Sequence, residues 1–333
     1  MAMVAEGYAL TAMSGISLRE AFGQALCDLA DEFKNVVVLD ADVAGDTGTY
    51  HFRKRHPERF LQFGIAEQNM MAAAGGLAAV GLVPIVTTLA VFCLRAVEQA
   101  RLSLAYAHRN AKIVASHGGL DAGPDGGALQ ALEDLAAFRA IPGMTVISPA
   151  DPLETALATR AMLQFDGPVY LRTGCSPAKR LFADDHRFEI GKGRIVRDGD
   201  DVTIVACGVQ VGRAVQAAEW LAKDGISARV VNMATIKPID STLLTRCAAE
   251  TGAFVTAEDH NIHGGLGSAV AESLAARSPC PIEFVGVKDV FGASGEPEEL
   301  AEKFGLSAPH IATAAKRAIE RKRNIAGRRK NFR

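Results

Sequence analysis

The chain has 333 residues, of which 49% are hydrophobic and 22% charged, and its formal net charge at pH 7 is −2. This length is sufficient for two α/β domains with separate cores, and the composition is that of a soluble globular protein. The small net charge gives no electrostatic reason to expect binding to nucleic acid or to an acidic membrane. The six cysteines are scattered, without a CxxC pair or a histidine at metal-ligand spacing, which favours a reducing cytoplasm over a disulfide framework or a zinc site.

The first half of the chain alternates short apolar runs with helical patterns. Residues 1–15 are expected to be a loose leader, and they are not a signal peptide because they lack its basic start. Strands are predicted at 36–39, 84–89, 111–116, 144–148 and 168–172, and helices at 18–33, 67–81, 91–108, 131–139 and 152–164. This alternation predicts a parallel sheet covered on both faces, with ligands at the carboxyl ends of its strands. Asp42, His117, Ser148 and Arg172 all follow or end such strands.

The periodicity lapses before a second series of the same kind begins. We expect a linker at 184–194, followed by strands at 202–207, 228–233, 253–257 and 282–287 and helices at 211–223, 241–250, 265–277, 297–304 and 309–322. The fold class is therefore α/β, with two doubly wound domains at 16–183 and 195–320. The basic tail at 321–333 is interpreted as solvated and frayed rather than as a nucleic-acid arm, since the rest of the chain is not basic.

One carboxylate, Glu67, lies at the start of a nearly uncharged stretch, within the sequence FGIAEQNM of residues 63–70. A carboxyl group that is buried in apolar surroundings keeps its proton to higher pH and can donate a hydrogen bond. The aminopyrimidine N1′ of thiamine diphosphate needs such a donor. An acidic residue in a first helical turn also stabilises a helix without any cofactor. The octapeptide alone leaves both interpretations open.

Three other segments carry candidate binding groups. Phe92 follows a predicted strand, where its ring can either stack on a flat ligand or pack in the core. Residues 117–127 combine His117, Asp121 and Asp125 with five glycines, which suits close approach to a ligand but also an ordinary surface loop. The run GGLG at 264–267 lacks a full dinucleotide-binding pattern, so helix–sheet packing is the better account. The nearby histidines at 260 and 263 do not form a metal site by themselves.

Taken together, these motifs resemble the C-terminal two-thirds of a transketolase, over residues 16–320. Gly64-Ile65-Ala66-Glu67-Gln68 is similar to the family motif G-x-x-E-[HQ], and the resemblance implies that Glu67 protonates the cofactor pyrimidine. The segment TLAVFCLRA at 88–96 is similar to the deoxyxylulose-phosphate synthase version of S-T-F-L-x-R-A. It implies that Phe92 stacks on the pyrimidine and that Arg95 lies close to the cofactor.

The resemblance also implies roles for residues outside these two motifs. Asp42 falls at a family aspartate near the cofactor, whereas Arg19 and Arg172 fall at arginines that hold a substrate phosphate. His117 is expected to act in catalysis by hydrogen-bonding substrate oxygens, and Asp125 to hold the loop or a substrate hydroxyl. The segments IKPID at 236–240 and EDH at 258–260 are typical of the family's C-terminal domain.

Two positions depart from the family pattern. Leu129 replaces the second histidine of the glycine-rich loop, which removes a hydrogen-bond donor of a kind that contributes about 10²–10⁴ to rate. Asp46 stands where a phosphate-contacting serine is common. A carboxylate there repels a phosphate by about 1–4 kcal/mol at 4 Å, depending on the effective dielectric. A standard sugar-phosphate donor is therefore in question.

No Gly-Asp-Gly sequence, which thiamine enzymes use to hold Mg²⁺ and the diphosphate, occurs in these residues. The resemblance therefore implies the second subunit of a two-gene transketolase, which transfers a two-carbon ketol unit from a ketose to an aldehyde. A separate subunit with the Gly-Asp-Gly motif is expected to complete an α2β2 assembly in the cytoplasm. The alternatives are another thiamine enzyme, such as a deoxy-ketose synthase or an oxo-acid dehydrogenase β subunit, or a catalytically silent paralogue.

Overall fold

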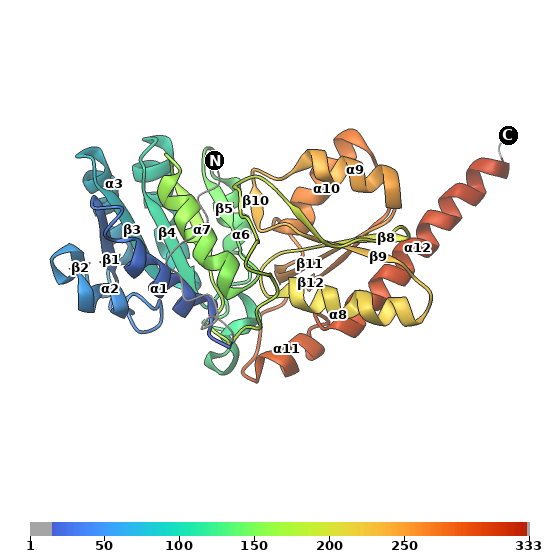
Figure 1. The fold of residues 1–333 in the computed structure, drawn as a ribbon, viewed down its shortest axis with the longest axis horizontal. Coiled ribbons are helices and arrows are strands. Elements are labelled where there is room, and N and C mark those ends of the chain that lie inside the picture. Colours follow the sequence, from blue (N-terminus) through green and yellow to red (C-terminus); the bar gives the residue numbers. More distant parts are fainter. Residues whose placement is uncertain (1–14, 332–333) are drawn as a thin grey trace.

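A computed structural model describes residues 15–331, and these form two α/β halves side by side (Figure 1). The first half holds a seven-stranded sheet in the order β10-β5-β6-β4-β3-β1-β2. Its strands are β1 (Val36–Asp40), β2 (Phe60–Gln62), β3 (Val83–Leu89), β4 (Lys112–Ser116), β5 (Thr145–Ile147), β6 (Val169–Arg172) and β10 (Thr235–Lys237). All pairs are parallel except β10 with β5. The expected parallel sheet is thus confirmed.

Helices cover both faces of this sheet, and its central strands β1, β3, β4 and β6 are buried at every position. Val36 and Val38 pack against α1 (Leu18–Leu29) and α7 (Pro152–Gln164), and Val37 and Leu39 pack on the opposite face. That opposite face is covered by α3 (Glu67–Ala79), by the π-helical segment η4 (Ala100–Tyr106) and by α6 (Asp134–Ala140). The helix predicted over 91–108 is interrupted, and consists of α4 (Ala90–Cys93), η3 (Leu94–Ala96), α5 (Val97–Gln99) and η4.

The second half contains a five-stranded sheet in the order β12-β11-β8-β9-β7. Its strands are β7 (Arg194–Arg197), β8 (Val202–Ala206), β9 (Ala228–Asn232), β11 (Phe254–Asn261) and β12 (Ile282–Val287), with only β7 antiparallel. Its helices are α8 (Gln210–Lys223), α9 (Ser241–Thr251), α10 (Leu266–Arg277), α11 (Pro297–Lys303) and α12 (Ala308–Asn331). The two-domain α/β class is therefore confirmed.

The two halves share a sheet and a core. Strand β10 follows β9 in the chain yet pairs with β5, so the second half contributes an edge strand to the first sheet. One hydrophobic cluster runs from Leu39 and Met70 in the first half to Leu244 and Leu266 in the second. The shared strand and core therefore join the two halves into one unit, to which the glycine-rich loop at 117–127 and the linker at 184–194 are attached.

The chain ends differ from the prediction in one respect. Helix α12 continues to Asn331, beyond the expected end at 322, so the described part of the basic tail is helical (Figure 1). The expected leader lies almost wholly outside the described residues. No helix within residues 15–331 is long and apolar enough to cross a membrane.

Candidate active site

The carboxyl ends of four neighbouring strands bring most of the predicted site residues to one edge of the first sheet. In sheet order, His117 follows β4, Phe92 lies in α4 directly after β3, Asp42 and Asp46 follow β1, and Glu67 lies beyond β2. Parallel sheets place their ligands at this edge because the loops that leave the strands converge there.

Glu67 begins α3, and its side chain is almost fully buried, with 5% of its surface exposed. No group among residues 15–331 forms a hydrogen bond with its carboxyl, and it makes no capping bond. Burial raises the pKa of the Cys93 thiol, and the charges of Asp134 and Glu67 raise it further, so Glu67 lies within electrostatic range of Cys93, one residue after Phe92. A buried carboxyl without a partner within its own chain is a group available to a ligand.

The residues around Glu67 connect the loops after β2 and β3. The Gln68 side-chain amide donates a hydrogen bond of 3.1 Å to the Arg95 carbonyl, and Phe92, three residues earlier, is half-buried. The Arg95 side chain is exposed. Asp42 is also exposed, has a φ of 65°, and donates its main-chain N–H to Gln62 Oε1 at 3.0 Å. The hydrogen bond between Gln68 and Arg95 thus ties the start of α3 to the segment that follows β3.

A second group forms around His117. Arg19 Nη1 lies 3.2 Å from His117 Nε2, 3.2 Å from the Asp46 carbonyl and 3.5 Å from Asp46 Oδ1. Asp125 Oδ2 lies 3.9 Å from the same imidazole nitrogen. Four predicted substrate-binding residues, Arg19, Asp46, His117 and Asp125, are therefore brought together, although they are spread over more than 100 positions of sequence.

His117 is buried and has a φ of 58°, and its Nδ1 lies 2.9 Å from Ser116 Oγ. Burial lowers the pKa of this imidazole, and the charge of Arg19 lowers it further, against smaller opposing effects of Asp46, Asp125 and Asp121. His117 is therefore neutral at pH 7, with Nε2 directed at the Arg19–Asp46 pair. A neutral imidazole can either accept or donate one hydrogen bond to a substrate oxygen.

The second half of the chain holds the glycine-rich loop in place. The Asp259 carboxylate, at the end of β11, accepts hydrogen bonds from the Leu120 and Asp121 N–H groups at 2.9 and 3.1 Å. Gly119, with a φ of 80°, approaches Asp259 so closely that a Cβ would lie 2.4 Å from its carboxylate. Sequence reasoning noted residues 258–260 only as a family signature. The available signal was the pair of acidic residues, Glu258 and Asp259, directly after the apolar start of β11.

Arg172, the second arginine predicted to hold a substrate phosphate, makes different contacts from those of Arg19. Its side chain is buried, its Nη2 donates to the carbonyls of Ala131 and Asp259 at 3.0 and 2.9 Å, and its Nε lies 3.0 Å from Asp134 Oδ2. Gly118 covers it, because a Cβ there would lie 2.0 Å from Nε. In the isolated chain the guanidinium therefore has internal partners behind the loop, and its assignment to a substrate phosphate stays a prediction.

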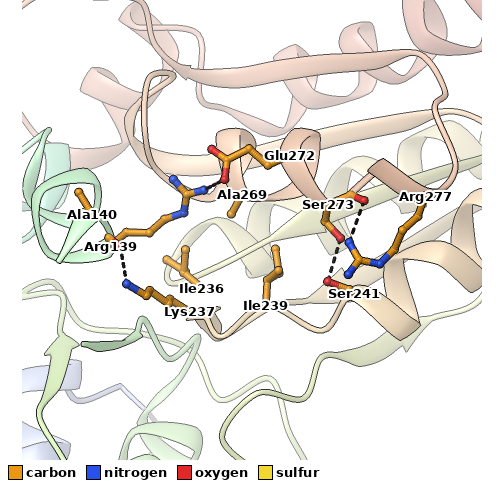
Figure 2. Close-up of a pocket in the computed structure, with 10 residues that line it drawn as sticks. All are labelled: Arg139, Ala140, Ile236, Lys237, Ile239, Ser241, Ala269, Glu272, Ser273 and Arg277. Atoms are coloured by element: carbon orange, nitrogen blue, oxygen red, sulfur yellow. Dashed lines mark hydrogen bonds and ion pairs between the residues drawn. The ribbon is translucent and has the colours of Figure 1, made fainter. Parts of the chain in front are cut away.

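Two other features lie away from this edge. A cleft of about 520 Å³ separates α6 from α9 and α10, and Figure 2 shows the Arg139–Glu272 ion pair and Lys237 at its wall. No predicted site residue lines it. The GGLG run begins α10, where Glu258 accepts the Leu266 and Gly267 N–H groups, in agreement with a packing role. Among the described residues, no cluster of three or more His, Cys, Asp or Glu is placed to hold a metal.

The chain is similar to proteins of one family along most of its length. Residues 14–176 match the family "Transketolase, pyrimidine binding domain", and residues 191–311 match "Transketolase, C-terminal domain". A 6-deoxy-6-sulfo-D-fructose transketolase subunit from Clostridium sp. (strain MSTE9) is 42% identical over 306 residues, which cover 92% of this chain and 95% of that protein. An apulose-4-phosphate transketolase subunit from Phocaeicola vulgatus is 35% identical, with 90% and 96% covered. The solved structure "Split gene transketolase, inactive beta4 tetramer" is 47% identical and has a TM-score of 0.85, with 93% and 100% covered.

Proposed function

The chain belongs to the transketolase family as the C-terminal subunit of a split, thiamine-diphosphate-dependent enzyme, and from this we propose that Glu67 is its cofactor-activating acid. The observation that carries the proposal is Glu67, a residue only 5% exposed, whose carboxyl forms no hydrogen bond or ion pair among residues 15–331 and lies within electrostatic range of Cys93, next to Phe92. An acid placed in this way fits a pyrimidine nitrogen, because a nearly buried polar group requires a hydrogen-bond partner.

Each residue of the open edge has a defined task in this proposal. When bound, thiamine diphosphate supplies the nucleophilic carbon that accepts a two-carbon ketol unit from a ketose. Glu67 holds a proton at the pyrimidine N1′, and Phe92 offers a face for stacking on that ring. Asp42 and Arg95, which are both exposed, border the cofactor on the solvent side. The protein thus orients the cofactor and controls one proton.

The substrate side uses the group around Arg19. The neutral imidazole of His117 binds a substrate oxygen through Nε2, and Asp125, 3.9 Å away, accepts a hydrogen bond from a substrate hydroxyl. Leu129 is half-buried and cannot donate a hydrogen bond, and His117 Nε2, which faces the donor Arg19 Nη1, can only accept, so in this proposal Arg19 is the donor of this group to the substrate.

The remaining parts of the site come from a second subunit. We infer that a partner with a Gly-Asp-Gly motif holds Mg²⁺ and the diphosphate, and that two copies of each chain form an α2β2 enzyme in the cytoplasm. The absence of Gly-Asp-Gly from this sequence supports this division. The ketose donor and the aldehyde acceptor are not assigned from the relatives, since the two named above act on different sugars.

The test is Glu67→Gln in the complex reconstituted with the partner subunit, Mg²⁺ and thiamine diphosphate. We expect turnover to fall by about 10²–10⁴, the usual contribution of a proton-transfer group, while the complex still assembles. Glu219→Gln, an identical change at an exposed position of α8, is the matched control and should retain full activity. Unchanged turnover in Glu67→Gln would refute the assignment. Circular dichroism of each isolated subunit shows whether it is folded. Release of CO₂ when the complex is given oxo acids would indicate an oxo-acid dehydrogenase and not a transketolase.

A further inference from the structure

The group around His117 has an excess of negative charge. Its one permanent cation is Arg19, whereas three carboxylates act on the imidazole, those of Asp46, Asp125 and Asp121. Within residues 15–331 no second arginine adjoins this group, since Arg172 is buried and occupied by Asp134 and two carbonyls. With the imidazole neutral, the formal charge of this group is negative by two.

The carboxylates differ in how accessible they are to a ligand. The Asp121 side chain is buried, and its Oδ2 accepts the N–H groups of Cys175 and Ser176 at 2.7 and 3.1 Å. The side chains of Asp46 and Asp125 are 56% and 45% exposed, so each can contact a substrate directly. Arg19 is only 28% exposed and already contacts Asp46 at two oxygens.

This distribution favours one kind of substrate terminus over another. Carboxylates only accept hydrogen bonds, so Asp46 and Asp125 suit hydroxyl groups, which donate. A phosphate monoester carries a charge of about −1.5 to −2 at neutral pH and presents acceptor oxygens alone. It would face two exposed carboxylates, while the single arginine is already in an ion pair.

The strand order indicates which end of the substrate meets this group. His117 follows β4 and Asp46 follows β1, whereas Glu67 begins α3, which packs on β3 and β1. Within the described residues, Glu67 shares no hydrogen bond or ion pair with Arg19, Asp46, His117 or Asp125, so the two groups occupy separate positions on this edge. A ketose whose reacting carbon lies next to the cofactor on the Glu67 side therefore extends its other end toward Arg19, Asp46 and Asp125.

On the basis of the proposed transketolase function, we propose that this enzyme selects ketose donors whose distal end is an uncharged hydroxyl, with Asp46 as the residue that discriminates against a phosphate. Asp46 acts in two ways. It accepts a hydrogen bond from a terminal hydroxyl, and it neutralises Arg19, the one cation of the group that could otherwise bind a phosphate.

The test uses three ketohexoses that differ only at carbon 6, namely fructose, 6-deoxy-6-sulfofructose and fructose 6-phosphate. The complex with its partner subunit is assayed with each donor and one common aldehyde acceptor. We expect kcat/KM to decrease in that order, as the terminal charge goes from zero through one to about two. Asp46→Ser should raise kcat/KM for the phosphate relative to fructose by about tenfold or more, because it removes a unit charge and frees Arg19.

Two further measurements separate charge from shape. Higher ionic strength should narrow the preference of the wild type for fructose, and should have less effect in Asp46→Ser, because salt screens exposed charges. Asp200→Ser, the same change on the β7–β8 connection of the second half, is the matched control and should leave all ratios unchanged.

The outcomes distinguish this inference from the proposed function. A preference for fructose 6-phosphate that Asp46→Ser leaves unaltered would overturn the inference while leaving ketol transfer established. Absence of transfer from every ketose, including the short uncharged donor erythrulose, in a complex that has bound its cofactor would overturn the proposed function and the inference with it.

Discussion

Replacing Arg172 by alanine tests whether this residue serves the fold or the substrate. Its guanidinium donates two hydrogen bonds to main-chain carbonyls, of Ala131 in the first half and Asp259 in the second, and lies 3.0 Å from Asp134. The Asp134 side chain is fully buried and has one other partner, the Tyr170 hydroxyl at 2.7 Å. Arg172→Ala therefore leaves a buried carboxylate with a single donor and two carbonyls with one partner fewer.

The expected cost follows from this geometry. Removing one member of a buried ion pair typically destabilises a protein by about 3–5 kcal/mol, because the other charge is left uncompensated. If the free energy of unfolding falls by about 3 kcal/mol per molar urea, this loss lowers the urea concentration at the unfolding midpoint by roughly 1–1.7 M. A residue that only contacts substrate would change activity and leave the midpoint of the isolated subunit almost unaltered.

The assay is urea unfolding of the isolated subunit, followed by far-ultraviolet circular dichroism and by fluorescence of the single tryptophan, Trp220. Arg55→Ala is the control, since Arg55 forms exposed ion pairs with Asp28 and Asp31, and such pairs contribute about 0–1 kcal/mol. The double variant Arg172→Met/Asp134→Leu should recover much of the loss, because no buried charge remains. An unchanged midpoint in Arg172→Ala would refute the structural role.

Two more predictions concern the loop and a buried lysine. Gly119→Ala should lower both the urea midpoint and kcat/KM, because the new Cβ would lie 2.4 Å from the Asp259 carboxylate at a φ of 80°; wild-type values for both would contradict this. Burial lowers the pKa of Lys112 from 10.5 to about 7, where its Nζ donates to the carbonyls of Phe165 and Gly167. The unfolded chain then binds more protons between pH 7 and 10.5, so the stability of the wild type relative to Lys112→Met should rise with pH across this range, by at most about 1.4 kcal/mol per unit. If the difference in unfolding free energy between the wild type and Lys112→Met stays constant between about pH 7 and 9, the lowered pKa of Lys112 is excluded.

Local sequence patterns were sufficient for most of the fold. The strands expected at 36–39, 84–89 and 202–207 are present within one or two residues, because fully buried parallel strands are continuous apolar runs with clear ends. Strand β10 was missed. It has three residues, and its partner β5 lies about 90 positions earlier, so its register depends on the packing of the two halves and not on its own composition.

The site was predictable in its residue types but not in all of its partners. A motif specifies which side chain stands at a position, whereas contacts between distant segments decide whether that side chain faces the ligand. Arg172 illustrates this, because Asp134 and the loop at Gly118 enclose a guanidinium that sequence similarity alone assigns to a phosphate. Asp259 shows the opposite, because no site role was predicted for it and yet its carboxylate holds the glycine-rich loop of the first half.

The two halves of the chain therefore contribute to the candidate site in different ways. The first half supplies the groups on the open edge, from Glu67 to His117, whereas the second half fixes the loop that presents His117 and Asp125. The Asp259 carboxylate accepts two adjacent main-chain N–H groups of this loop, and charge-assisted bonds of this kind are among the stronger hydrogen bonds in proteins. Preorganised polar groups lose little on binding, so we expect this loop to keep its position when a ligand binds.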